Sequence, residues 1–495
     1  MNMILESRNK LIFTGIIISI VFLFFIVINP LVSILFECGL LIFLISLCIK
    51  EKVFFAFIFL YPLAPTYFAF DIGKALPLLT VGRLLLLYVI LFDLIFNRNK
   101  FREIKKKFAR KEVKAITFSI VFLVFSFILN YFTYPNVESF KILIAFLIEN
   151  IFLGVYIFLR IGSSEDIEKA VNCFLFAAFF IALAGILEFF LGVNIFSFLD
   201  IVKSSRQLLS SSVYQRLGES RIEGPFGHPL AYCNVLLMAI PMGIYKWQIS
   251  KEIKVKTAYL AIILVFLINF LFTLSRGPML ALIIGLIFYF TFTNKRSKQI
   301  LFMLGGAFLG VLLFGLITGV LPGFIRIFIL SLIDSVMMRN SGGGFGANAN
   351  AASYRLYLFD LARKLVTDNY IWSGRGMSFF RLNEVYDWVP GISNTREIRI
   401  VSVDNYYVLK YIEMGLTGLI STLTFIFILI YSCIKNFFRT LNKEFNLCFM
   451  VIFISYFISL FTVDDIGTFK FLWIVAGIAA AKISLDKCEK REANI

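Results

Sequence analysis

The chain has 495 residues, of which 60% are hydrophobic and only 16% are charged. A surface that poor in charge excludes a soluble globular domain. The formal net charge of +17 could suggest nucleic acid, but the lysines and arginines are scattered through loops between apolar runs, where orientation in a bilayer and contact with anionic lipid explain them more simply. We therefore predict a polytopic membrane protein.

Apolar runs long enough to cross a bilayer recur along the sequence. Each can span a hydrocarbon core of ~30 Å at ~1.5 Å per residue, and each must satisfy its own backbone hydrogen bonds, which makes it a helix. The predicted fold class is an all-α polytopic membrane protein with about 14 transmembrane helices and a large outer loop that carries amphipathic helices. The predicted spans are residues 11–29, 31–49, 53–70, 78–96, 115–133, 141–160, 170–192, 229–246, 258–274, 278–293, 299–318, 405–434, 446–463 and 467–482.

The basic residues predict how the chain is oriented. The first run is longer than a signal-peptide core and lacks a small-residue cleavage site, so we expect it to be retained as a span. Alternation from an inside start then places the lysine-rich segment 97–114 and the tail from residue 482 in the cytoplasm, together with both termini. The opposite side is rich in arginine, whose planar fork grips phosphate or carboxylate bidentately. An oxyanion ligand on that side is one interpretation, and contact with lipid headgroups is the other.

Residues 1–495 read as one integral-membrane domain with two long outer loops, residues 193–228 and 319–404. We call residues 319–404 the lid. Within it we predict an interfacial or re-entrant helix at 324–338, a glycine-rich hinge at 341–352, and an amphipathic helix. Tyr354, Tyr357, Leu358, Leu361 and Leu365 form the apolar face of that helix, and the hinge would let it swing over a site.

Four polar patches lie at predicted outer ends of spans, where they could reach both water and a lipid-borne substrate. They are R-I-E-G-P-F-G-H-P at 221–229, T-L-S-R-G-P at 273–278, S-Y-R at 353–355 with S-G-R-G at 373–376, and V-D-N-Y-Y-V-L-K-Y-I-E-M-G-L-T-G-L at 403–419. We find no nucleotide or P-loop fingerprint. The single histidine disfavours metal catalysis, and no cysteine lies in a predicted outer loop, so we expect no metal site and no disulfide framework.

The ordered set of patches resembles the O-antigen ligase and polymerase superfamily. The patterns of that family are R-x-x-G-x-F-x-H-P-N, T-x-S-R-G, an arginine-bearing helix before G-x-G, and H-N-x-Y-L followed by E-x-G-x-x-G-L, and the resemblance covers roughly residues 215–435. It implies a GT-C-like membrane glycosyltransferase that needs neither nucleotide sugar nor metal. Such an enzyme moves a glycan from undecaprenyl diphosphate to an acceptor at the outer face of the bacterial cytoplasmic membrane.

The arginines are the candidates for holding the diphosphate. A leaving diphosphate develops negative charge, which preorganised guanidinium groups stabilise without donating a proton. We predict catalytic roles for Arg221 and Arg276, and substrate binding by Arg355 and Arg375. Arg276 is the strongest of these candidates, because Gly277-Pro278 would fix it on a tight turn. The alternative for all four is headgroup anchoring or structural pairing with Glu219, Glu223 or Asp360.

The acceptor hydroxyl needs a base. Family members usually carry His before the Asn of the fourth patch, whereas this chain has Asp404 before Asn405, so Asp404 is the candidate base, with a helix N-cap as its alternative role. His228 could position the donor, orient a catalytic group, or sit neutral and hydrogen-bonded at a helix entrance. We also assign Asn405 and Glu413 to substrate binding, and expect Glu413 to face the bundle and pair with an arginine.

The sequence thus predicts a bacterial polysaccharide polymerase that joins undecaprenyl-diphosphate-linked repeat units. Its partners would be that donor, a glycan acceptor and membrane lipid, and a flippase and a chain-length regulator are further candidate partners. We expect no cofactor. An O-antigen-type ligase and a transporter or flippase of an anionic glycolipid remain alternatives. Polymerase is preferred partly because the usual histidine is absent.

Overall fold

The computed structural model describes residues 42–101, 104–199, 219–294, 346–388, 397–440, 443–463 and 469–492, apart from 72, 75, 401 and 402, together with 215, 216, 298 and 323. The predicted spans at 11–29 and 299–318 and the interfacial helix at 324–338 lie outside the described residues, apart from residue 323 beside the latter.

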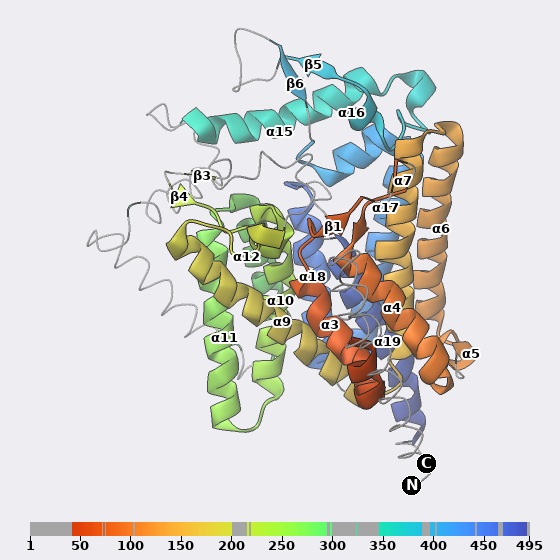
Figure 1. Cartoon of the computed structure of the whole chain (residues 1–495), viewed down its shortest axis with the longest axis vertical. Coiled ribbons are helices and arrows are strands. Elements are labelled where there is room, and N and C mark those ends of the chain that lie inside the picture. The colour runs from red at the N-terminus through yellow and green to blue at the C-terminus, as the bar shows by residue number, and fades with distance from the viewer. Residues whose placement is uncertain are drawn as a thin grey trace, which may run out of the picture.

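The described part of the chain is a bundle of long helices (Figure 1). Its helices are α3 (Val53–Leu63), α4 (Val81–Phe96), the short α5 (Ile104–Lys107), α6 (Lys111–Thr133), α7 (Val137–Phe146), α8 (Leu153–Arg160), α9 (Ser164–Leu191), α10 (Pro229–Ile249), α11 (Ile253–Phe272), α12 (Arg276–Phe292), α17 (Tyr406–Arg439), α18 (Lys443–Ser459) and α19 (Phe469–Glu492). A π-helical segment, η4 (Leu147–Phe152), joins α7 to α8.

Six helices of the described residues are long and apolar enough to cross a membrane. They are Lys111–Thr133, Val137–Arg160, Ser164–Leu191, Pro229–Ile249, Ile253–Phe272 and Tyr406–Arg439, and Arg276–Phe292 is apolar but shorter. The chain is therefore a multi-pass, mainly helical membrane protein, as predicted. The larger number of spans stays a prediction.

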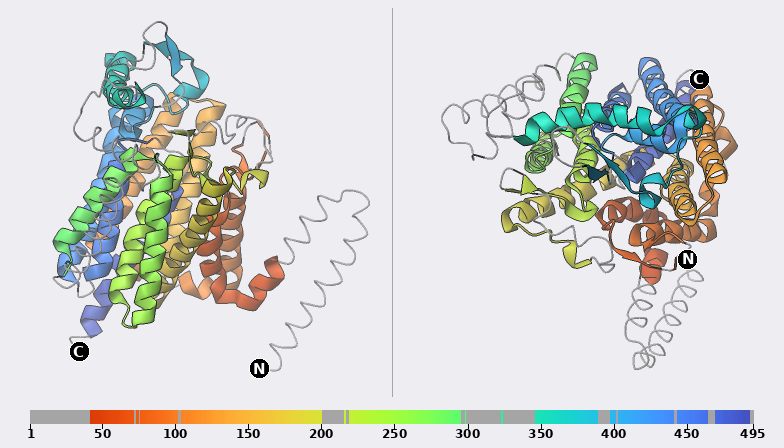
Figure 2. Two further views of the ribbon diagram at one scale, coloured as in Figure 1. Left: turned by 90° about the vertical axis from the view of Figure 1, so that its left-hand side faces the viewer. Right: turned by 90° about the horizontal axis from the view of Figure 1, so that it is seen from above.

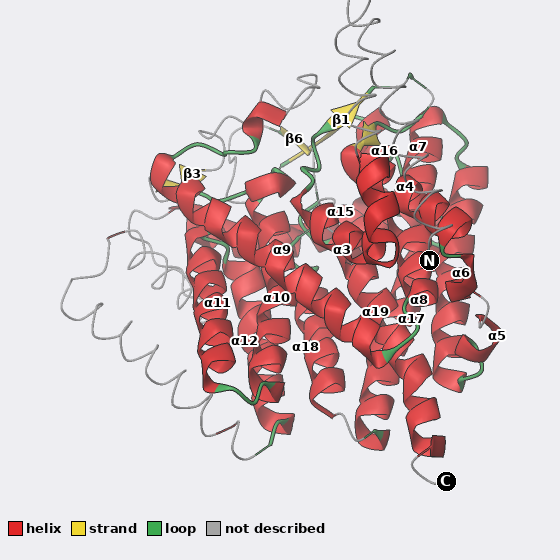
Figure 3. Ribbon diagram, turned by 60° about the horizontal axis from the view of Figure 1, so that its bottom comes forward, coloured by secondary structure: helices red, strands yellow, loops and turns green. Residues whose placement is uncertain are grey.

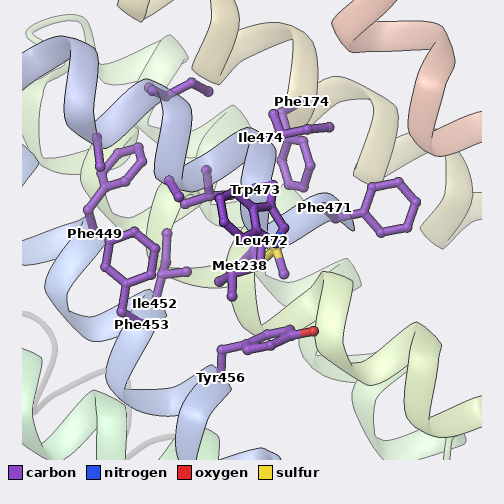
Figure 4. Close-up of a cluster of buried hydrophobic side chains, with 14 of the residues drawn as sticks. Phe174, Met238, Phe449, Ile452, Phe453, Tyr456, Phe471, Leu472, Trp473 and Ile474 are labelled. Atoms are coloured by element: carbon purple, nitrogen blue, oxygen red, sulfur yellow. The ribbon is translucent and has the colours of Figure 1, made fainter. Parts of the chain in front are cut away.

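The core of the bundle is aromatic. Trp473 of α19 stacks on Phe425 of α17, with ring centroids 4.8 Å apart, and it is 1% exposed. Side chains of α9, α10 and α18 surround it (Figure 4). Gly154 and Gly477 let α8 and α19 approach closely, because an added Cβ at Gly154 would lie 2.8 Å from the Trp473 ring. This packing buries the first turn of α19 in the bundle.

The lid covers one end of the bundle. Its helix α15 (Gly346–Leu365) lies across that end in the view from above (Figure 2), and we call this end the lid end. Tyr357, Leu358 and Leu361 are buried with Val408 and Ile412 of α17, which confirms the predicted apolar face. The predicted hinge is wrong from Gly346 onward, because those residues already belong to α15.

Short strands interrupt the all-α pattern only in connecting segments (Figure 3). Three antiparallel ribbons occur among the described residues: β1 (Ala69–Phe70) with β2 (Leu79–Thr80), β3 (Gln215–Arg216) with β4 (Glu219–Ser220), and β5 (Val385–Asp387) with β6 (Ile398–Ile400). The lid also contains α16 (Phe379–Leu382). In the lid, Tyr357 and Lys364 of α15 both donate hydrogen bonds to Asp387 of β5 at 2.7 Å, which ties the ribbon to the helix.

Candidate functional site

Arg221 binds the turn that leads into Arg276, at the lid end where α12 begins. Arg221 donates from Nε to the Thr273 carbonyl and from Nη2 to Ser275 Oγ, both at 2.8 Å. Ser275 immediately precedes Arg276, the first residue of α12, which is 8% exposed. Two predicted catalytic arginines from separate patches therefore share one short stretch of backbone.

The turn that carries Arg276 is rigid. Leu274 is fully buried and adopts φ +49°, a left-handed conformation that a bulky residue rarely takes. Gly277 packs directly on Thr462, since an added Cβ would lie 2.3 Å from Thr462 Oγ1. The sequence predicted a tight turn, and the structure adds that Arg276 and Gly277 already belong to the first turn of α12.

His228 caps the start of α10. Its Nδ1 accepts a hydrogen bond from the Leu230 backbone N–H at 3.1 Å, so the proton of the neutral ring lies on Nε2. Burial, together with the nearby Arg221 guanidinium, lowers the pKa of His228 to about 4. Of its three predicted roles, this geometry matches the neutral, hydrogen-bonded residue at a helix entrance.

Glu188 holds the loop that carries Arg221. Its two carboxylate oxygens accept the backbone N–H groups of Glu223 and Gly224 at 2.9 and 3.0 Å, and Asn194 donates to Glu223 Oε1 at 3.3 Å. A small cavity of about 10 Å³ lies among Glu188, Asn194, Arg221 and Glu223. That volume is near the size of one water molecule. This polar support was not predicted, because α9 lies far from the patch in sequence.

Asn405, and not Asp404, caps α17. Asn405 Oδ1 accepts from the backbone N–H groups of Tyr407 and Val408 at 3.1 and 3.2 Å. Asp404 is half-buried and lies one position earlier, outside the helix. The capping role considered for Asp404 therefore belongs to its neighbour.

The end of α18 brings the patches together. Tyr406 N–H donates to the carbonyls of Leu460 and Val463 at 2.9 and 3.0 Å, which places the start of α17 beside that end. Thr462 lies between these two carbonyls in sequence and packs on Gly277 of α12. Ser459 Oγ also lies 2.9 Å from Asn234 Oδ1 of α10. The starts of α12 and α17, next to Arg276 and Asp404, thus lie beside the end of α18, and α10, which His228 caps, contacts the same end through Asn234. No sequence patch included α18.

The other predicted binding residues occupy a separate contact between the lid and α17. Arg375 donates from Nε to the Leu365 carbonyl at 2.7 Å and stacks on Tyr370, with its Cζ 3.9 Å from the ring centroid. Glu413 forms a buried ion pair with Lys410 at 2.9 Å, on its own helix, where the sequence predicted an arginine partner. The backbone joins Arg375 to α17, because its N–H donates to the Ile412 carbonyl at 2.8 Å. The side chain of Arg355 lies outside the described residues, although its backbone belongs to α15.

Sequence reasoning also missed buried cations in the bundle, namely Arg83, Lys410 and Lys470. The signal was available, because each interrupts an apolar run, where a charge is costly unless it serves a purpose. Among the described residues, no group of three or more His, Cys, Asp or Glu side chains could hold a metal ion.

Comparison with known proteins gives one family match. Residues 260–423, from α11 through the lid to the first half of α17, match the family model described as O-Antigen ligase. Among curated proteins, none matches the chain. The matched segment contains the second, third and fourth patches and therefore both Arg276 and Asp404. This match confirms the resemblance and supports the place of the chain in the O-antigen ligase and polymerase superfamily.

Proposed function

We propose that the protein is a bacterial polysaccharide polymerase that joins undecaprenyl-diphosphate-linked repeat units at the outer face of the cytoplasmic membrane. The observation that carries this proposal is the contact between Arg221 and the backbone that holds Arg276. The Arg221 guanidinium binds the turn that leads into α12, and Arg276 is the first residue of that helix, whose N–H groups and dipole also favour an anion. A diphosphate fits this combination of charge and donors.

The reaction needs no group beyond the side chains of the site and the two substrates. The acceptor hydroxyl would attack the anomeric carbon of the donor glycan, and the new glycosidic C–O bond would form as the bond to the diphosphate breaks. The diphosphate leaves with the electron pair, and Arg221 and Arg276 stabilise its charge. Asp404 would take the proton of the hydroxyl.

The proposal includes an orientation. With both termini in the cytoplasm, the lid end faces outward, and the lysine-rich segment 97–114 lies inside. Lipid-linked substrates would reach the arginines from the outer leaflet. A flippase that delivers them and a regulator of chain length are the partners this arrangement would need.

An O-antigen-type ligase is the second candidate, and the description of the matched family, O-Antigen ligase, names this activity. The two differ in the acceptor, which is another lipid-linked repeat in the polymerase and a different glycan in the ligase. A transporter or flippase of an anionic glycolipid is the third candidate, and purified protein that lengthens a lipid-linked oligosaccharide alone would exclude transport as the main activity.

Replacing Arg276 with alanine tests the proposal in a complemented strain. We expect the polymer to disappear while the protein is still made at its normal level, because the leaving group loses a preorganised charge. Arg363→Ala is the matched control, since its side chain on α15 is 83% exposed and contacts Asp360 only at 3.5 Å. Full-length polymer from the Arg276→Ala strain would refute the catalytic assignment.

A further inference from the structure

Glu188 is a buried acid in the last turn of α9, a helix long enough to span the membrane. It is 4% exposed, and the helix ends three residues later at Leu191. The described hydrogen bonds of its side chain are to two backbone N–H groups rather than to a cation. An ionisable residue inside a membrane span is costly, and such a residue is a candidate for a functional role.

The two N–H groups that Glu188 accepts belong to the turn directly after Arg221. One oxygen accepts from Glu223 at 2.9 Å, and the other accepts from Gly224 at 3.0 Å. Among side chains of this length, only a carboxylate offers two acceptor oxygens, since glutamine would present its NH₂ group to one of the two N–H donors. The contact therefore requires glutamate and explains why a buried acid stands here.

The same turn is fixed from other sides. Ile222 is fully buried, and the Gly224 carbonyl accepts a hydrogen bond from Asn194 at 2.9 Å. One turn before Glu188, Gly185 lets α9 approach closely, because an added Cβ would lie 2.5 Å from Asn269 Oδ1 and 3.1 Å from the Ile222 side chain. The backbone after Arg221 is thus held against α9.

This support determines where the Arg221 side chain begins. An arginine side chain has about 2 kcal/mol of rotamer entropy, so its guanidinium is well placed only if its backbone is fixed. Both described hydrogen bonds of the Arg221 guanidinium, to the Thr273 carbonyl and to Ser275 Oγ, need that backbone in one position. Glu188 and Arg221 also line the same small cavity.

We propose that Glu188 is a positioning residue for the glycosyl transfer. It fixes the backbone after Arg221 and thereby sets the place of the Arg221 guanidinium at the diphosphate. This inference rests on the proposed function. Glu188 itself touches no substrate and acts through Arg221. The alternative is a purely structural role in packing α9 on the loop, and the two differ in whether the effect of Glu188 on diphosphate binding depends on Arg221.

A double-mutant cycle tests this dependence in the full-length protein in lipid nanodiscs. The four proteins are the parent, Glu188→Gln, Arg221→Ala and the double variant, and the measurement is thermal stabilisation by inorganic pyrophosphate. Glu168→Gln is the control. Glu168 also lies on α9, and its carboxylate also accepts two hydrogen bonds, from the Tyr245 hydroxyl and from Lys246 at 2.8 Å.

We expect Glu188→Gln and Arg221→Ala each to raise the half-saturating concentration of pyrophosphate about 10-fold, the effect of losing one charge-assisted contact. The double variant should also show a rise of about 10-fold, because Glu188 has nothing to position once Arg221 is absent. Glu168→Gln should leave the concentration unchanged. A double variant in which the two effects multiply to about 100-fold would show an independent structural role and overturn the proposal. Parent-like affinity of either single variant would overturn it as well.

Asn194→Ala replaces Glu188→Gln in the cycle if the latter protein does not fold. Asn194 holds the same turn from outside α9, through the Gly224 carbonyl at 2.9 Å and Glu223 Oε1 at 3.3 Å. The same rise and the same dependence on Arg221 are expected, and full affinity for pyrophosphate would overturn the proposal. A parent protein that pyrophosphate does not stabilise contradicts the proposed function itself. A parent that binds pyrophosphate, with a Glu188→Gln protein that binds it equally well, overturns only the role of Glu188.

Discussion

At the scale of single residues, Asp404 and Asn405 are both candidates for the helix cap of α17, and the sequence could not show which of them has that role. Both residue types cap helices well, and both precede the apolar run of α17. The structure gives the cap to Asn405. The cap therefore does not explain Asp404, which keeps its proposed role as the base.

Exchanging Asp404 for asparagine should therefore abolish polymer formation and leave thermal stability nearly unchanged. Asp404→His should retain part of the activity, because an imidazole at this position is what the family resemblance implies. The measurement is polymer length on gels together with melting of the purified protein. Asn405→Ala is the comparison, expected to lower stability by ~1 kcal/mol through loss of the cap. Normal polymer from Asp404→Asn would show that Asp404 is not the base.

The lowered pKa of His228 should make the stability of the folded protein depend on pH. Its pKa is about 4 in the folded protein, because of burial and Arg221, against ~6.5 in an unfolded chain. Between these values the unfolded chain binds a proton that the folded protein does not, so stability falls as pH drops from about 6.5 to about 4. His228→Asn, which keeps an N-cap acceptor without titrating, should lose less stability over this range. Identical melting curves of both proteins against pH would contradict this assignment.

The residues of the site were predictable to the extent that they lie in short sequence patterns. Arg221, Arg276, His228 and Asp404 were found from the patches, and the structure brings their helices together. Glu188 was not assigned to the site, because its partners, the backbone N–H groups of Glu223 and Gly224, lie in a distant segment of the sequence. Such contacts depend on tertiary packing, which local patterns do not contain.

At the scale of elements, glycines fix the lid to α17. Gly415 interrupts α17 with φ +64° and ψ −159°, a conformation essentially restricted to glycine. There, the backbone N–H groups of Arg375 and Gly376 donate to the carbonyls of Ile412 and Glu413, both at 2.8 Å. The contact leaves no room for side chains, because a Cβ on Gly374 would lie 2.5 Å from backbone atoms of α17.

Replacing Gly415 with alanine should release this contact at a cost of about 3 kcal/mol, from the forbidden backbone conformation alone. We expect a lower melting temperature and faster tryptic cleavage in α15, at the exposed Arg363 and Lys364. Gly162→Ala is the control, since an added Cβ there meets only Asp166 Oδ2 at 3.7 Å. Cleavage of Gly415→Ala at the rate of the parent would mean that the glycines do not hold the lid.

The same contact revises the predicted motion of the lid. The glycine-rich composition of 341–352 suggested a hinge, yet the helix begins at Gly346. On the far side, Asn130 of α6 donates to the Ser373 carbonyl at 2.9 Å and accepts from the Met377 N–H at 2.9 Å. Periodicity predicted α15 and its apolar face correctly, because both follow from local sequence. It could not show that the following turn is anchored to two helices of the bundle.

At the scale of the whole molecule, hydropathy predicted a helical membrane bundle, and the structure adds how the patches meet. Their helices begin around the end of α18, a helix with no recognised motif. Seven helices of the described residues are apolar and span or nearly span a bilayer by length. Hydropathy counts such runs but does not order them in space, so it could not place Arg221 against the turn that precedes Arg276.

The predicted orientation of the bundle in the membrane can be tested at its C-terminus and its lid. The lysine-rich segment 97–114 and the lysines near residue 482 lie away from the lid in the predicted topology, and the positive-inside rule keeps such segments in the cytoplasm. A green fluorescent protein fused after Ile495 should therefore fluoresce, and protease added to spheroplasts should cut α15 but spare the fusion. A protected lid with an exposed C-terminus would place the arginines on the cytoplasmic side. Substrates carried by the outer leaflet could not reach the arginines there. An inverted topology would therefore also contradict the proposed polymerase reaction.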